Sequence, residues 1–382
     1  MRWSVPLSVL FLASPAFACL VFCVSDGKHV YAGNNEDWSD PRTRMWVVPG
    51  EGGQHGRIYF GYHDGFAQGG VNDAGLFFDG LALDHEEVAK SDKPEFDGHP
   101  GELALATCTT VREVVELFEK HDRQLLSDAQ LFFGDKTGDG VVFEGNAVVR
   151  KTGPYLLATN FRQSEVPPKL AGCGRYDGAS KLLDGMKDVT VDACRRILAT
   201  THQEGEYPTV YSNVYDLANG KIHLYHFHDF DQPVVVDVAT EIAKGAHTVE
   251  LDTLFPEKFA FATFRQQSDE AVAERREKER DPKVDPKTFD DFVGRYLVKD
   301  GEHAGFEFRV RREKDKLLGD FPKQDPAELI PHGGDVFVCI ARLERAEFTF
   351  HRDPGGNVDR VRIVQSDVEL SAERVERGTD GR

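Results

Sequence analysis

The sequence predicts an α+β fold in two parts, and three observations support this. Antiparallel hairpin patterns dominate, two adjacent helical stretches interrupt them, and a highly charged stretch precedes a second set of short strands. Strands and helices do not alternate regularly, so the order favours a layered antiparallel domain over a doubly wound βαβ fold. We therefore expect a large layered domain followed by a small all-β domain.

The first strand is predicted over residues 19–25, a continuous apolar run typical of a strand that is buried on both faces. A turn at Asp26-Gly27-Lys28 leads to its partner strand at 29–33. Three further hairpins are expected: 131–134 with 141–143, 147–151 with 155–160 across Gly153-Pro154, and 209–216 with 221–227. The remaining strands of this domain are predicted at 44–48, 57–62, 76–82, 131–134, 141–143, 209–216 and 221–227.

Helices are indicated where apolar residues recur on one side at helical spacing. The stretch 110–121 has this spacing and begins at a cap, Thr109 or Thr110. Two more helices are predicted at 176–186 and 190–202.

A domain boundary is predicted at residues 266–287, which are dense in both charge signs and almost free of apolar residues. This stretch is expected to be a linker or a short exposed helix between a domain at 19–265 and one at 288–366. The second domain is expected to be a small β-barrel or sandwich, and 367–382 a polar, frayed tail. Its strands are predicted at 306–311, 316–320, 336–341, 346–351 and 358–364.

Residues 1–18 have the pattern of a secretory signal peptide. Arg2 is the only charge, a short apolar core follows, and Ala16-Phe17-Ala18 is a small-x-small end. The apolar run is too short to span a bilayer, and no later segment is long enough. Cleavage is therefore expected to release a periplasmic or secreted protein that begins at Cys19. Lipid attachment at Cys19 is the alternative, although the bulky Phe17 argues against it.

A cysteine at a mature N-terminus carries a thiol and a free α-amine on one residue. The ordinary pKa of an α-amine is about 7.7–8, so part of it is neutral at neutral pH and can accept the thiol proton. Cys19 would then be a nucleophile with its own base, and removal of the leader would be its activation step.

Charge and cysteine content restrict the class of protein further. The 382 residues carry a formal charge of -19, which becomes -20 when Arg2 leaves with the leader, and no basic face is evident. Nucleic acid is therefore excluded as a partner.

The exported compartment permits disulfides, and Cys173–Cys194 is the first pair to test; small buried thiols are the alternative. The cysteines besides Cys19 are Cys23, Cys108, Cys173, Cys194 and Cys339.

The start of the expected mature chain combines Cys19, a hairpin and the run Gly33-Asn34-Asn35-Glu36-Asp37-Trp38. This resembles the choloylglycine hydrolase and penicillin V acylase family, Ntn-hydrolases that cleave linear amides and open with Cys, a hairpin and Gly-Arg-Asn-x-Asp-[Trp/Tyr]. The pattern overlaps with acyl-CoA:6-aminopenicillanic acid acyltransferases. The resemblance implies a four-layer αββα sandwich, and a role for Asp37 in holding the α-amine or the thiol.

Three later stretches extend the resemblance over about residues 19–240: the turn Asn72–Leu76, the strand end Leu156–Asn160, and the hairpin from Tyr211 to Lys221. The resemblance implies that Asn160 donates to the oxyanion and that Arg175 belongs to the site. The supporting candidates are Asn34, Asn35, Asn72 and Asn213.

The sequence departs from the family at two site positions. Asn34 replaces an Arg that helps to set the charge state of the nucleophile, so weaker thiolate stabilisation is expected. Ala82 falls where the family has a second oxyanion Asn. Leu20 in place of the usual Thr is a tolerable change.

The other candidate sites are weaker. Four aromatic residues could line a pocket for an apolar acyl group, and ordinary core packing is the alternative for each: Phe60, Phe66, Phe77 and Phe161. His226 and His228 share a strand face near His223, but no spaced acid or Cys completes a metal site, so neither metal nor cofactor is expected. Residues 289–356 resemble the small β-barrel appended to some serine β-lactamase-like hydrolases, which implies an accessory role.

The sequence therefore predicts an exported amidohydrolase that cleaves the carbon–nitrogen bond of a small N-acyl substrate through a thioester on Cys19. Three alternatives stay open: an acyltransferase, a catalytically silent binding protein and a surface lipoprotein. The acyl group and the oligomeric state, including a homo-oligomer, are not determined by the sequence.

Overall fold

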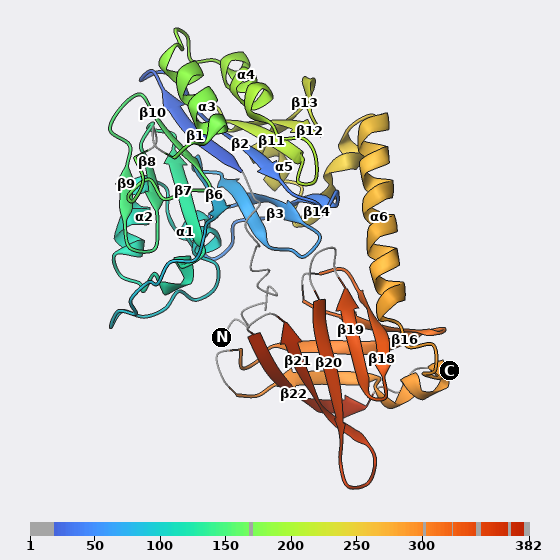
Figure 1. Ribbon diagram of the computed structural model, residues 1–382. Coiled ribbons are helices and arrows are strands. Elements are labelled where there is room, and N and C mark those ends of the chain that lie inside the picture. Colours follow the sequence, from blue (N-terminus) through green and yellow to red (C-terminus); the bar gives the residue numbers. More distant parts are fainter. Residues whose placement is uncertain are drawn as a thin grey trace. The chain divides into compact units, whose positions relative to one another are not determined.

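The computed structural model describes residues 19–167, 171–300, 303–322, 324–340, 345–365 and 368–377; the predicted signal peptide lies outside these residues. The chain divides into two compact units (Figure 1). The first unit, the layered domain, contains the described residues up to Phe261, except His63–Gly65. The second unit, the barrel unit, contains His63–Gly65 and the described residues from Ala262 onward. No helix among the described residues is both long and apolar enough to cross a membrane.

The first sheet of the layered domain is antiparallel and places β2 between β1 and β11. Its strand order is β10-β1-β2-β11-β12-β13. The first five residues of β1 are buried, as its continuous apolar run predicted. The strands are β1 (Leu20–Ser25), β2 (Val30–Asp37), β10 (Tyr155–Thr159), β11 (Thr209–Asp216), β12 (Lys221–His226) and β13 (Asp229–Asp237).

The second sheet is also antiparallel, in the order β14-β3-β4-β5-β6-β7-β8-β9. The sequence did not predict β5, because its glycines at 69 and 70 have low strand propensity. The strands are β3 (Thr43–Val48), β4 (Arg57–Tyr62), β5 (Ala67–Asn72), β6 (Leu76–Ala82), β7 (Ala129–Asp135), β8 (Gly140–Phe143), β9 (Val148–Arg150) and β14 (His247–Glu250).

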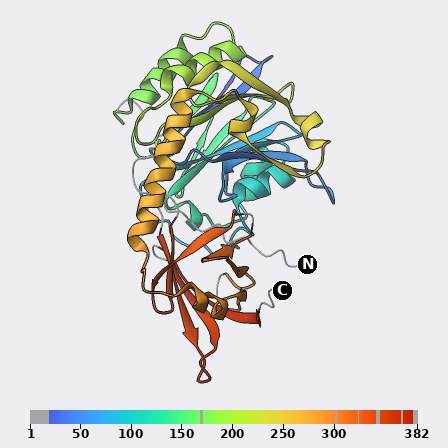
Figure 2. The same cartoon turned by 90° about the vertical axis from the view of Figure 1, so that its right-hand side faces the viewer.

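The two sheets face each other, and helices cover both outer faces (Figures 1 and 2). Between the sheets, Phe60 of β4 and Phe77 of β6 pack on Tyr215 of β11. Apolar residues of α3 (Gly174–Asp184) and α4 (Val191–Thr201) pack on the first sheet, and those of α1 (Pro100–Thr107) and α2 (Val111–Phe118) on the second. The expected four-layer αββα arrangement is therefore present. A short helix α5 (Val238–Ile242) follows β13.

The predicted hairpin of 147–151 with 155–160 is wrong. Both strands form, but β9 pairs with β8 in the second sheet and β10 pairs with β1 in the first. The turn at Gly153-Pro154 therefore carries the chain from one sheet to the other. A local turn pattern does not distinguish these two outcomes, because the partner of β10 lies far away in the sequence.

The barrel unit is a closed barrel of strands β15 to β22 in sequence order, among the residues that the structure describes. Buried aromatic and aliphatic side chains fill it, including Phe337 and Phe350, which meet edge to face. The strands are β15 (Gly294–Val298), β16 (Glu307–Glu313), β17 (Lys316–Asp320), β18 (Ala327–Gly333), β19 (Val336–Ile340), β20 (Arg345–Arg352), β21 (Val358–Gln365) and β22 (Val368–Arg377).

Two predictions for this region are corrected. The polar stretch after residue 366 is not a frayed tail up to 377, because β22 pairs with β21 and β15 and closes the barrel. Of the two alternatives for 266–287, a linker or a short exposed helix, the helix is found over most of the stretch, but it is longer than expected: it belongs to α6 (Phe259–Glu279), whose Ala, Glu, Gln, Arg and Lys residues have high helix propensity. Its even mixture of charges left the extent of the helix undetermined from the sequence, because it leaves no apolar stripe.

Candidate active site

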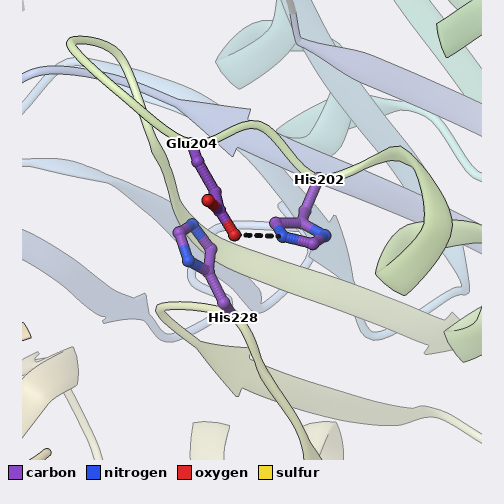
Figure 3. A group of neighbouring side chains, drawn as sticks. All are labelled: His202, Glu204 and His228. Carbon is purple, nitrogen blue, oxygen red and sulfur yellow. Dashed lines mark hydrogen bonds and ion pairs between the residues drawn. The ribbon is translucent and has the colours of Figure 1, made fainter. Parts of the chain in front are cut away.

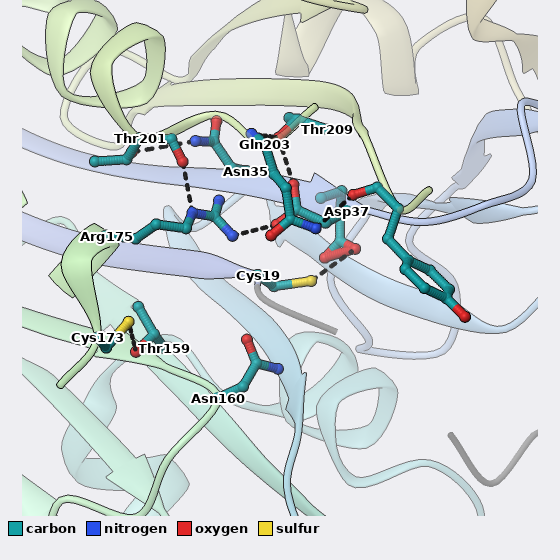
Figure 4. A network of polar contacts seen from close by, with 12 residues as sticks. Cys19, Asn35, Asp37, Thr159, Asn160, Cys173, Arg175, Thr201, Gln203 and Thr209 are labelled. Atoms are coloured by element: carbon teal, nitrogen blue, oxygen red, sulfur yellow. Dashed lines mark hydrogen bonds and ion pairs between the residues drawn. The ribbon is translucent and has the colours of Figure 1, made fainter. Parts of the chain in front are cut away.

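Cys19 lies directly before β1, between two neighbouring strands. Leu20 is paired with Asn35 of β2 on one side and with Thr159 of β10 on the other. One residue earlier, Cys19 therefore lies level with Glu36 and Asn160. Its side chain faces the space between the sheets, where Sγ is 3.7 Å from Glu36 Oε2 (Figure 4). Only 7% of Cys19 is exposed, so the thiol is a buried group.

The space around this thiol contains two buried carboxyl groups from different sheets. Glu36 of β2 accepts from the thiol and, at 3.5 Å, from the hydroxyl of Tyr62. Asp79 of β6 has no exposed surface, and neither of its carboxylate oxygens has a hydrogen-bond partner among the described residues. Gly69 makes room for Asp79, because a Cβ at Gly69 would lie 2.6 Å from Asp79 Oδ2.

Burial, and repulsion between neighbouring carboxylates, disfavour the ionised forms of Glu36, Asp79 and the Cys19 thiol. Burial raises the pKa of Glu36 to about 8, with Asp37 adding to the effect, and raises the pKa of Asp79 well above its usual range. Burial and the carboxyl groups of Glu36, Asp37 and Asp79 together raise the pKa of the Cys19 thiol. With residue 18 still attached to Cys19, the thiol is therefore held in its protonated form.

Asp37 lies on the opposite face of β2 and is held by two groups. Arg175 of α3 donates from Nη1 to Asp37 Oδ2, and the Thr209 hydroxyl donates to Oδ1 (Figure 4). Burial raises the pKa of Asp37 to about 7, while Arg175 and Thr209 both favour the ionised form. Arg175 is fixed by a second bond from Nε to Thr201 O at 2.6 Å, and its Nη2 has no partner among the described residues.

Asn160 follows β10 and is half-buried beside the start of β1. Its Nδ2 donates to the backbone carbonyl of Ala82 at 2.8 Å, and its Oδ1 is buried without a partner in the described part of the chain. An amide nitrogen carries two hydrogens, so one remains available. The contact also shows where Ala82 lies: its backbone reaches Asn160, but its side chain has no hydrogen-bond donor.

Two of the supporting candidates face the space between the sheets. Asn34 and Asn213 are paired across β2 and β11, and both are buried. Neither Oδ1 has a hydrogen-bond partner among the described residues, whereas Asn213 Nδ2 is 3.1 Å from the Tyr215 hydroxyl. Asn34 is therefore a buried, polar and uncharged group on the inner face of β2.

The other two supporting candidates have structural contacts instead. Asn35 faces α4, where its Nδ2 donates to Leu198 O and Thr201 Oγ1 at 3.0 and 3.2 Å. Asn72 binds the backbone of the β5–β6 turn and donates to the carbonyls of Leu105 and Cys108. Asn72 therefore joins a turn to the end of α1.

The four aromatic candidates do not form one group. Phe60 and Phe77 have no exposed surface and pack on tyrosines of β11, so they are core residues between the sheets. Phe66 packs on the ring of His99, and Phe161 packs on Tyr176 of α3.

The cysteine and histidine predictions have different outcomes. The described residues include all six cysteines, and none of them is in a disulfide. Cys173 instead caps α3, where Sγ accepts from Tyr176 N at 3.5 Å, and Cys194 is buried in the core under α4. Cys173–Cys194 is therefore not a bonded pair.

His228 does not join His223 and His226 in a cluster but lies beside His202 and Glu204.

Three features of this region were not found from the sequence. Glu36, Asp79 and Thr209 lie on separate strands, and they meet the predicted residues only after the sheets pair and stack. The signal that could have indicated Glu36 is its place directly beside Asp37, where strand alternation puts its side chain on the opposite face of β2.

Comparisons with known proteins include one match to a family model. The family described as "Domain of unknown function (DUF3471)" matches residues 278–379, which include all strands of the barrel. No curated protein matches the chain.

Solved structures similar to this chain include two variants of the conjugated bile acid hydrolase from Clostridium perfringens. The first is 14% identical over 63% of this chain and 97% of the hydrolase, with a TM-score of 0.48. The second is 15% identical over 61% and 96%, with a TM-score of 0.48. The penicillin V acylase from Agrobacterium tumefaciens is 15% identical over 61% of this chain and 91% of the acylase, with a TM-score of 0.46.

Proposed function

We propose that this chain is an exported amidohydrolase whose nucleophile is the N-terminal Cys19, exposed when residues 1–18 are removed. It cleaves the linear carbon–nitrogen bond of an N-acyl substrate through a thioester. The observation that carries the proposal is the convergence on Cys19 of groups from separate segments: Glu36 and Asn160 beside it, and the Asp37–Arg175 pair behind it. Acyl transfer uses a nucleophile, a hydrogen-bond donor for the oxyanion and a group that orients the base, a role that the Asp37–Arg175 pair can fill for the α-amine.

The acidic surroundings of Cys19 support activation by cleavage. In the unprocessed chain, nearby carboxyl groups and burial raise the thiol pKa, which is the opposite of what a nucleophile needs. Cleavage before Cys19 creates an α-ammonium group on the same residue, next to Glu36 and Asp37. This positive charge lowers the thiol pKa, and the neighbouring carboxylates stabilise the ammonium. The same acids therefore inhibit the precursor and hold the α-amine of the mature protein.

The proposed reaction uses groups of this chain alone. The neutral α-amine of Cys19 accepts the thiol proton, and the sulfur attacks the acyl carbonyl carbon. The oxyanion receives a hydrogen bond from the remaining Asn160 Nδ2 hydrogen and one from a backbone N–H, since Ala82 offers no side-chain donor. The α-ammonium then protonates the leaving nitrogen, and the carbon–nitrogen bond breaks. A water molecule, deprotonated by the α-amine, releases the carboxylic acid and restores the thiol.

The proposed substrate is a small N-acyl amide with an apolar acyl group. Phe66 and Phe161 remain candidates for its contacts, because both are only half-buried, whereas Phe60 and Phe77 are core residues. If an amine replaces water in the second step, the same site is an acyltransferase. Product analysis with and without an added amine distinguishes the two.

The first test is the intact mass of the exported protein before and after iodoacetamide treatment, followed by peptide mapping. The proposal predicts a chain that begins at Cys19 and is alkylated there faster than at any other cysteine. It also predicts that the mature thiol becomes reactive at a lower pH than the thiol of a chain that retains residues 1–18. A diacylated Cys19 would instead indicate a lipoprotein. A free Cys19 that shows no selective alkylation would favour a silent binding protein.

A further inference from the structure

His202, Glu204 and His228 come together at one corner of the layered domain, from two segments of the chain (Figure 3). His202 caps the C-terminus of α4, Glu204 follows in the loop to β11, and His228 lies in the turn between β12 and β13. Their ligand atoms all lie within 4.8 Å of one another, and the two imidazole rings are 4.7 Å apart. One ion could therefore contact all three.

The hydrogen bonds of the two imidazoles leave nitrogen atoms available to a ligand. His202 Nδ1 is 2.7 Å from the carbonyl of Ala199, so Nδ1 carries the hydrogen and Nε2 is left with a lone pair. That Nε2 faces Glu204 Oε1 at 3.4 Å. His228 Nε2 is buried and has no hydrogen-bond partner among the described residues. A metal-binding His typically has its other nitrogen bonded to a carbonyl or carboxylate, as His202 has.

The backbone at His228 is an independent observation. Phe227 and His228 have φ of 41° and 66°, and a two-residue hairpin turn with two positive φ values normally uses Asn or Gly. A residue with a side chain in this region costs about 1–3 kcal/mol. The turn therefore retains His228 in a strained conformation that directs it towards His202 and Glu204.

We propose that His202, Glu204 and His228 bind one Zn²⁺ ion. Two imidazole nitrogens and one carboxylate form a ligand set that zinc uses, whereas Ca²⁺ and Mg²⁺ prefer oxygen ligands alone. The ion joins the loop after α4 to the β12–β13 turn. That loop also carries Gln203, whose backbone N–H donates to the Thr209 hydroxyl at 2.8 Å, and Thr209 in turn bonds Asp37. Bound zinc therefore stabilises a segment next to Asp37, without a role in the proposed chemistry.

The test measures zinc content and affinity, so it does not depend on the proposed activity. Purified full-length protein is stripped with a chelator, loaded with Zn²⁺, passed through a desalting column and analysed by elemental mass spectrometry, with calorimetry for the affinity. The wild type is expected to retain one zinc per chain. His228→Gln and Glu204→Gln are expected to weaken binding by at least about 10–100-fold, because each removes a direct ligand. Zinc should raise the melting temperature of the wild type but not that of these two variants.

Two matched variants serve as controls. His29→Gln alters an exposed His–Asp pair with a 3.0 Å contact to Asp26 and should leave zinc binding unchanged. Cys19→Ser removes a thiol that could bind zinc and should also retain one equivalent. Glu204 is 77% exposed at its side chain, so Glu204→Gln tests the site even if His228→Gln does not fold. A wild type that retains no zinc, or a Glu204→Gln variant that binds zinc as tightly as the wild type, overturns the proposal.

Discussion

The two faces of β2 differ in how their polar groups are satisfied. On the face towards the helices, both Asn35 and Asp37 have partners for every side-chain nitrogen and oxygen, from α3, α4 and β11. On the face between the sheets, Asn34 and Glu36 each retain a buried oxygen without a partner in the described residues. Buried polar groups are normally paired, so unsatisfied ones require a reason.

This difference separates two kinds of role along one strand. On the helix-facing side, Asn35 fixes the position of the strand, and its loss should reduce stability, whereas Asp37 on the same side belongs to the proposed site. The groups between the sheets surround the Cys19 thiol, and their unpaired state is consistent with a ligand or with the α-ammonium that cleavage would add. The following predictions test whether activity depends on the groups around Cys19 and stability on Asn35.

The largest expected effect is at Cys19. Cys19→Ala should abolish amide hydrolysis by the mature protein, because no other group can form the thioester, and Cys19→Ser should leave little activity. Turnover of an N-acyl amide panel and trapping of the acyl-enzyme by mass spectrometry measure this. Circular dichroism should show that both variants are folded. Full activity in either variant would exclude Cys19 as the nucleophile.

A smaller loss of activity is expected at Asn160. Asn160→Ala should lower kcat by about 10²–10³-fold with a lesser change in KM, which is typical for loss of an oxyanion donor. Asn72→Ala is the matched control, because Asn72 is also a bonded Asn but holds a turn and the end of α1. It should reduce stability and leave the kcat of the folded fraction unchanged. Equal kcat losses in both variants would indicate that Asn160 acts through structure alone.

On the outer face, the expected effect is on stability. Asn35→Ala removes donors to Leu198 O and Thr201 Oγ1 and an acceptor for the Ser212 hydroxyl, all buried. Leaving such groups unpaired costs about 1–3 kcal/mol of unfolding free energy. Urea unfolding at one pH measures it. A variant that is as stable as the wild type but loses activity would contradict the division between the two faces.

The sequence predicted the parts of this region that depend on local pattern. The burial of β1, the helices α3 and α4, and the pairing of β11 with β12 follow from apolar periodicity, caps and turn residues. The neighbours of Cys19 that lie on other strands were not predictable in this way. Asp79 reaches the thiol only because two sheets stack, and β10 lies beside β1 because a turn changes sheet rather than closing a hairpin. These are long-range consequences of packing.

The barrel also shows where local sequence pattern fails to predict a strand. Its apolar alternation predicts several strands, yet the residues of β22 read as a tail because polar residues dominate them. A strand on a closed barrel needs apolar residues at alternate positions only, and Leu370 and Ala372 supply them. Closure therefore depends on a strand that the sequence indicates weakly.

The smallest expected effect concerns the pH dependence of stability. In the unprocessed chain, burial raises the pKa of Glu36 from 4.5 to about 8. Between these values the unfolded chain has released the proton and the folded chain retains it, so this group makes stability fall as pH rises. Glu36→Gln removes that contribution. Urea unfolding at about pH 5 and about pH 8 should therefore show a smaller fall in the variant than in the wild type.

Glu113 provides a control of opposite sign. Backbone N–H groups at Thr109 and Thr110 lower the pKa of its carboxyl, so its contribution to stability is present at neutral pH and is lost as pH falls. Glu113→Gln should destabilise the protein at neutral pH, and the difference from the wild type should shrink towards acid pH. If Glu36→Gln instead behaves like Glu113→Gln, then Glu36 is ionised and paired in the folded chain. The inner face of β2 would then be satisfied like the outer one.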